Sequence, residues 1–179
     1  MPARDFNDSA EKPQPVQLVR KLFLASVQSG NTEIVAQILG SHPESANWAM
    51  PPFPFRPFEE SMTALMMAAE RGHIDIVRLL LKAGAERDAQ ESKGFSALML
   101  AAQGGHKNVV DAMLEHSANT ALRNKDGDTA ATLAAKRGDA DTARRINDAL
   151  KIFGLSRLNE GAGHAVTSPA TARWRKKPG

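Results

Sequence analysis

The chain has 179 residues, of which 42% are hydrophobic and 24% charged, and its formal net charge is +3. These values are near globular averages and fit neither a wholly disordered chain nor a membrane protein. The absence of cysteine excludes disulfides, thiolate metal ligands and thiol nucleophiles, and it favours a cytoplasmic location. The N-terminus carries acids and prolines where a signal peptide would be apolar, so we expect neither export by that route nor membrane insertion.

The positive charge is concentrated near the C-terminus. From Leu155 onward, five basic residues and one acidic residue carry a net charge of +4, which leaves −1 for the other 154 residues. Phosphate binding needs clustered Lys and Arg. Any contact with nucleic acid is therefore expected only through the C-terminal cluster of Arg173, Trp174, Arg175, Lys176 and Lys177.

The chain begins with a tail and a weak first unit. Residues 1–15 are polar, rich in proline and without apolar periodicity, which predicts a disordered segment. Residues 16–60 form the first unit, because Gly30, Ile34 and Val35 match Gly72, Ile76 and Val77 at an offset of 42 residues.

An insertion at 47–60 distinguishes this first unit from the others. Four prolines alternate with phenylalanines there, a pattern typical of an extended path rather than a helix. Two interpretations stay open, since the aromatic residues either contact a partner or cover the apolar flank of the first unit. The candidate contacts are Trp48, Phe53 and Phe55.

A period of 33 residues follows and predicts three units, at 61–93, 94–126 and 127–154. Gly72, Gly105 and Gly138 keep this spacing, and so do the alanine pairs that begin at 68, 101 and 134. In the third unit, apolar spacing predicts a helix from Ala97 to Gly104 and a second helix over about 108–116, with Gly105 between them. One such unit cannot bury its own apolar face, so the units must stack.

The chain ends in a polar unit and a second tail. The last repeat replaces apolar positions with polar ones, as the end of a solenoid requires. Residues 155–179 are basic and lack apolar periodicity, so we expect a disordered tail there.

Several motifs resemble the ankyrin repeat: the 33-residue period, the run Gly94 to Leu98, the Ala-Ala pair before Gly105-His106, and Leu80-Leu81 before Gly84-Ala85. The resemblance covers about three quarters of the chain. It implies an all-α solenoid with β-turn fingers. First helices would line a concave face and second helices the convex back.

The helix starts depart from the family pattern T-P-L-H. This chain has TALM at 63–66, SALM at 96–99 and TAAT at 129–132, so the preset φ of proline and the family histidine are both missing. We expect Met66 and Met99 to fill the space with apolar packing instead.

No catalytic or cofactor-binding pattern emerges, and we expect neither enzyme activity, nor a cofactor, nor a metal site. His73 and His106 stand one repeat apart at the starts of second helices, beside the equivalent Asn31 and Asp139. These four positions predict helix capping or other local hydrogen bonds rather than metal binding.

The expected function is non-catalytic binding of another protein by an adaptor that is a monomer on its own. The resemblance places the contacts on the fingers and at the ends of first helices. These candidate residues are Met62, Glu70, Arg71, Ser92, Lys93, Phe95, Gln103, Lys125, Asp126, Asp128, Lys136 and Arg137. Two alternatives remain, a ribonucleoprotein component anchored by the basic tail and a secreted effector that binds a host protein.

Overall fold

A computed structural model describes residues 15–49 and 62–162, with side chains for 16–49 and 62–151. The described residues form eight α-helices and one short 3-10 helix, η1 (Pro43–Asn47). The α-helices are α1 (Pro15–Ser29), α2 (Thr32–Ser41), α3 (Ala64–Arg71), α4 (Ile74–Lys82), α5 (Ala97–Gly104), α6 (Lys107–Glu115), α7 (Ala130–Arg137) and α8 (Ala140–Ala162). Within these ranges, β-pairing is limited to two isolated bridges, Ala49–Thr63 and Gln90–Ser96.

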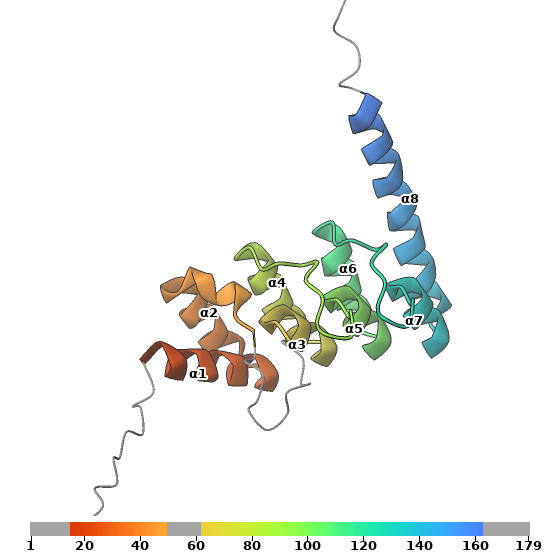
Figure 1. Ribbon diagram of the computed structural model, residues 1–179. Helices are drawn as coiled ribbons and strands as arrows, with labels where there is room; N and C mark the ends of the chain where they lie inside the picture. The colour runs from red at the N-terminus through yellow and green to blue at the C-terminus, as the bar shows by residue number, and fades with distance from the viewer. Residues whose placement is uncertain (1–14, 50–61, 163–179) are drawn as a thin grey trace, which may run out of the picture.

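The helices form two layers in a stack of four helix pairs (Figure 1). The first helices α1, α3, α5 and α7 pack in sequence along one layer, and α2, α4, α6 and α8 pack along the other. The main helix–helix contacts run within a unit or between units that are adjacent in the chain, which is the arrangement of a solenoid. The predicted all-α repeat solenoid is confirmed.

Each first helix after α1 begins and ends in the same way. The hydroxyls of Thr63, Ser96 and Thr129 accept hydrogen bonds from the backbone N–H three residues later, which satisfies a donor that the helix leaves open. At the other end, Gly105 has φ of 75°, a left-handed conformation that strains residues with a β-carbon. Helix α5 matches its predicted bounds, while α6 lies one residue earlier than expected.

The core is continuous from unit to unit. The alanine pairs of α3 and α5 are fully buried, so these helices approach each other closely. Met66 and Met99 are each 1% exposed, which confirms their predicted packing role. The second helices add an apolar stripe to the same cluster, for example Val77 and Leu80 in α4.

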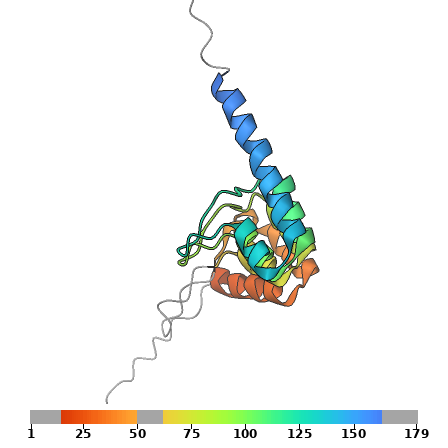
Figure 2. The ribbon, with the colours of Figure 1, turned by 90° about the vertical axis from the view of Figure 1, so that its right-hand side faces the viewer.

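The connections between units project to one side of the helices as parallel fingers (Figure 2). The backbone N–H of Lys125 donates to the carbonyl of Lys93 at 2.9 Å, so neighbouring fingers are bonded to each other. A β-carbon at Gly94 would lie 3.0 Å from the Asn124 Cα, too close for an ordinary contact. Glycine at this position therefore allows the fingers to stack.

The C-terminal end of the stack differs from the sequence prediction in one respect. Helix α8 continues to Ala162 and leaves the stack (Figure 1), whereas the sequence predicts that the last unit ends at residue 154 and that a disordered tail begins at residue 155. Residues 1–14, 50–61 and 163–179 lie outside the described residues. The expectations for Phe53, Phe55 and the cluster at 173–177 fall there.

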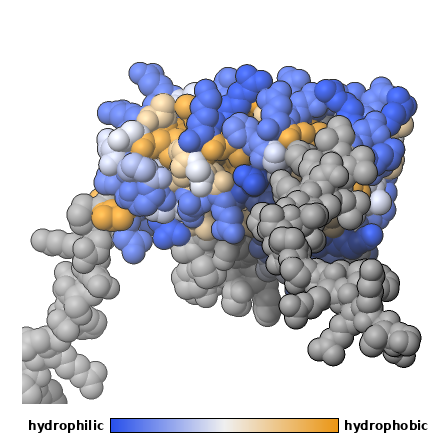
Figure 3. All heavy atoms as spheres, turned by 90° about the horizontal axis from the view of Figure 1, so that it is seen from above, coloured by the Kyte–Doolittle hydropathy of each residue, from blue (hydrophilic) through white to orange (hydrophobic). Residues whose placement is uncertain are grey.

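Hydrophilic residues cover most of the surface that Figure 3 shows from above, with apolar patches between them. No helix in the described ranges combines the length and the apolar character needed to cross a membrane.

Candidate protein-binding surface

The ends of the first helices present a row of exposed side chains. Glu70 and Arg71 close α3, Gln103 lies near the end of α5, and Lys136 and Arg137 close α7. All five are exposed. Because α3, α5 and α7 are neighbours in one layer, the structure brings these predicted residues to one surface. With the finger tips, we call it the first-helix surface.

Hydrogen bonds between units fix the register of this row. His73 Nε2 lies 3.3 Å from the Gln28 carbonyl oxygen, and His106 Nε2 lies 2.9 Å from that of Glu70. Each ring nitrogen donates across the boundary to the preceding unit, since a carbonyl only accepts. Each bond also satisfies a carbonyl that the end of a helix leaves open.

The predicted capping role is therefore wrong for His73 and His106. Neither side chain caps the helix that follows it, because both rings are turned toward the unit before. Asn31 and Asp139 do act as caps, with their side-chain oxygens accepting from Ile34 N at 3.2 Å and Thr142 N at 3.1 Å.

The last unit replaces the histidine with a different donor. Asp139 occupies the position of His106 one repeat later, and Arg137 Nη1 donates to the Gln103 carbonyl at 3.2 Å in its place. The hydrogen bond from the Thr142 backbone lowers the pKa of Asp139, and the nearby Lys107 ammonium, 3.4 Å away, acts in the same direction. Both contacts are charge-assisted and join the last two units.

Two buried polar side chains, which sequence reasoning missed, shape the finger tips. The Glu91 carboxylate, 7% exposed, accepts from the backbone N–H of Lys93 and of Phe95, both at 2.7 Å. Asn124, one repeat later, accepts from the N–H of Asp126 at 3.0 Å and of Asp128 at 2.8 Å. The sequence signal that could have identified these two side chains is a polar residue three positions before each turn glycine.

The predicted finger contacts fall into two groups. Met62 and Phe95 are half-buried and pack against the core, so they anchor their fingers. At the tips, the exposed residues are Ser92, Lys93, Lys125 and Asp126.

Asp128 links its finger to the end of the following first helix. Its carboxylate lies 2.6 Å from Lys136 Nζ, and this hydrogen bond lowers the pKa of Asp128. Lys136 is thus held beside the finger.

Trp48 lies against the first unit. Its ring meets Phe23 edge to face, with centroids 5.6 Å apart and an interplanar angle of 88°. The guanidinium of Arg20 donates to the Ala49 carbonyl, with Nε at 3.1 Å, and ties the adjacent backbone to α1. For Trp48, these contacts agree with the covering interpretation of the insertion.

Comparison with known proteins identifies the repeats. A family model described as ankyrin repeats, in three copies, matches residues 22–124. The chain belongs to the ankyrin repeat family. The match begins within α1 and ends in the finger after α6, while the structure adds α7 and α8 as a fourth helix pair. A search of curated proteins found no match.

Ankyrin repeats are generally modules for binding other proteins. Among the described residues, no group of three or more His, Asp or Glu side chains is placed to hold a metal ion.

Proposed function

We propose that this ankyrin repeat chain is a non-catalytic adaptor that binds a partner protein through its first-helix surface. One observation carries the proposal. The hydrogen bonds from His73, His106 and Arg137 hold the exposed ends of α3, α5 and α7 in a fixed register. A partner therefore meets a preformed surface and does not have to order it, which reduces the entropic cost of binding.

The polarity of the surface favours recognition by charge pattern. Glu70, Arg71 and Gln103 are exposed, and the Arg71 side chain makes no hydrogen bond or ion pair with the residues that the structure describes. Both signs of charge stand along one row, so a partner with the complementary order of charges would be selected against others. Phe95 stabilises the adjoining finger because it is half-buried against the core.

Charge reversal at Arg71 tests the proposal with a matched control. Arg71→Glu and Lys82→Glu each replace an exposed cation in the last turn of a helix, α3 and α4 respectively. Each substitution therefore places a negative charge near the negative end of a helix dipole, and both variants carry the same type of destabilisation. We expect Arg71→Glu to weaken capture of the partner from the native source by about thirtyfold, corresponding to the ~2 kcal/mol of an interface hot spot.

Lys82→Glu should leave capture unchanged, and both variants should have nearly the same melting temperature. Equal capture by Arg71→Glu and the unaltered protein would contradict binding at this part of the surface. A loss with Lys82→Glu alone would place the contact on the second helices.

A further inference from the structure

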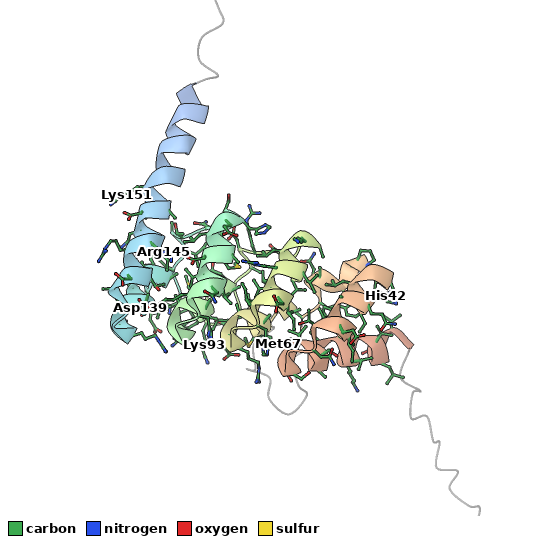
Figure 4. All side chains as sticks on the ribbon, turned by 180° about the vertical axis from the view of Figure 1, so that it is seen from behind. His42, Met67, Lys93, Asp139, Arg145 and Lys151 are labelled. Carbon is green, nitrogen blue, oxygen red and sulfur yellow. The ribbon has the colours of Figure 1, made fainter. Side chains whose placement is uncertain are left out.

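A shallow groove lies on the other layer of the molecule, between α6 and α8. Its open volume is about 350 Å³, and its lining residues are Asp111, Leu114, Glu115, Arg145, Asp148 and Ala149. Arg145 pairs with Asp111 at 3.0 Å across the two helices. In Figure 4, Arg145 stands where α8 passes α6, and Lys151 stands further along α8.

The groove is acidic. Three carboxylates and one guanidinium line it. Asp148 pairs with Lys151 of its own helix at 3.2 Å, whereas the Glu115 side chain makes no hydrogen bond or ion pair with any residue in the described ranges. Glu115 is also the last residue of α6, where the open carbonyls of the helix end add partial negative charge. The site therefore favours a cationic segment.

The groove also offers apolar surface. Leu114 is half-buried, and the nearby Leu150 of α8 is 41% exposed. Leu150 follows Ile146 by one helical turn, and Ile146 is 1% exposed in the core. The buried stripe of α8 thus continues past the point where the stack ends, and a flat apolar group would reduce its exposure to water.

One segment of this chain has the matching chemistry. The C-terminal sequence Arg173-Trp174-Arg175-Lys176-Lys177 carries four cations around an indole. Trp174 is twelve residues beyond Ala162, where α8 ends, and twelve residues can span about 40 Å. The distance back along α8 from Ala162 to Asp148 is about 21 Å at 1.5 Å per residue. The chain after Ala162 is therefore long enough for Trp174 to reach the groove.

We propose that residues 173–177 dock intramolecularly in the groove between α6 and α8. The cations pair with Glu115 and compete with Lys151 for Asp148, and the indole of Trp174 covers the apolar stripe beside Leu150. This contact folds the basic segment onto the second-helix layer, away from the first-helix surface. It does not depend on the proposed partner-binding function.

A spin label on the tail tests this placement in the full chain. Because the chain has no cysteine, Ala172→Cys provides a single attachment site for a nitroxide. At 0.1 M salt we expect paramagnetic broadening of the backbone amides of Leu114, Glu115 and Ala149. At 1 M salt we expect its loss, since the screening length falls from about 10 Å to about 3 Å.

Two double variants separate a specific contact from general attraction. Glu115→Lys with Asp148→Lys reverses the groove and should abolish the broadening. Glu33→Lys with Asp75→Lys makes the same change in net charge on exposed residues of α2 and α4 and should preserve it. Melting curves of both variants verify that the stack remains folded.

Three results would overturn the proposal. The first is an absence of broadening at the groove amides in the labelled chain. The second is broadening that persists in the groove variant or moves to Arg71 and Gln103. The third is equal broadening in a mixture of isotope-labelled protein and separately spin-labelled protein, which would show contact between copies and not within one chain.

Discussion

The two ends of this stack are stabilised by different forces. At the N-terminal end, Phe23, Val27 and Val35 are fully buried and Trp48 packs edge to face on Phe23. Apolar burial dominates there, and it depends little on salt or pH.

At the C-terminal end the buried residues are smaller. Ala131 and Ala143 stand at the positions that Phe23 and Val35 occupy in the first unit. Polar contacts across units add to them, notably Lys107 with Asp139 and Arg145 with Asp111. The last unit thus depends on charge, and its stability should respond to pH and ionic strength more than that of the first unit.

The outer surfaces of the ends differ as well. Leu22 of α1 is 51% exposed, although Ala64 and Ala97 at the matching positions of α3 and α5 are buried. At the other end, Thr132 and Lys136 face outward from α7. The outer face of α7 thus carries polar groups, whereas that of α1 still exposes apolar surface.

The largest expected effect on the free energy of unfolding comes from a core substitution in the middle of the stack, which joins the two ends. Leu98 is 1% exposed in α5, and Leu98→Ala should lower the free energy of unfolding by about 2–5 kcal/mol. Because the middle units hold an interface on each side, amide hydrogen exchange should accelerate in both α3 and α7. Asn147→Ala, on an exposed site of α8, should stay within about 0.5 kcal/mol in urea titrations.

Equal losses for Leu98→Ala and Asn147→Ala would contradict the assignment of core and terminal unit.

The next largest effect on stability comes from comparing equivalent positions of two first helices, one in the middle of the stack and one at its N-terminal end. Ala97→Leu places a larger side chain in the closed interface between α3 and α5 and should cost about 1–3 kcal/mol. Leu22→Ala removes an exposed side chain at the matching position and should change the free energy of unfolding by less than ~0.5 kcal/mol. A large loss for Leu22→Ala would show that another segment covers this face of α1.

The smallest expected effect is the pH response of the charged end. The pKa values of Asp128 and Asp139 are lowered in the folded chain, so the folded state favours their ionised forms. Their stabilisation is complete above the unfolded value of about 4 and is lost as the pH falls through the lowered folded values. Asp128→Asn with Asp139→Asn should therefore destabilise the chain at pH 7 and make little difference in acid.

Urea midpoints measured from pH 7 to pH 2 would show this convergence. Asp75→Asn is the control, because Asp75 is exposed and has no ion pair among the residues described. A difference between the double variant and the unaltered protein that stays constant down to pH 2 would contradict the role of these carboxylates.

The sequence was sufficient for what depends on local spacing. The helix Ala97–Gly104 and the left-handed Gly105 follow from apolar periodicity and the tolerance of glycine for positive φ. The last three units follow from the 33-residue period, and the first unit follows from the match at an offset of 42 residues. The exposed row at Arg71 and Gln103 follows from the same repeat.

Contacts between units were harder to predict. His73 and His106 precede helices, which suggests local capping, yet their partners are carbonyls 45 and 36 residues earlier. Trp48 meets Phe23 across the first unit for reasons of packing that no spacing encodes. The extension of α8 to Ala162 was also not predicted, because the last unit lacks the strong apolar pattern of its neighbours.

Hydrogen exchange of the full chain with and without its captured partner tests the central claim most directly. Binding at the first-helix surface predicts slower exchange in the fingers, at residues 91–96 and 124–128, and at the ends of α3 and α5. Exchange in α4 and the first turns of α6 should not change. Protection confined to α2, α4 and α6, with the fingers unaffected, would contradict the account.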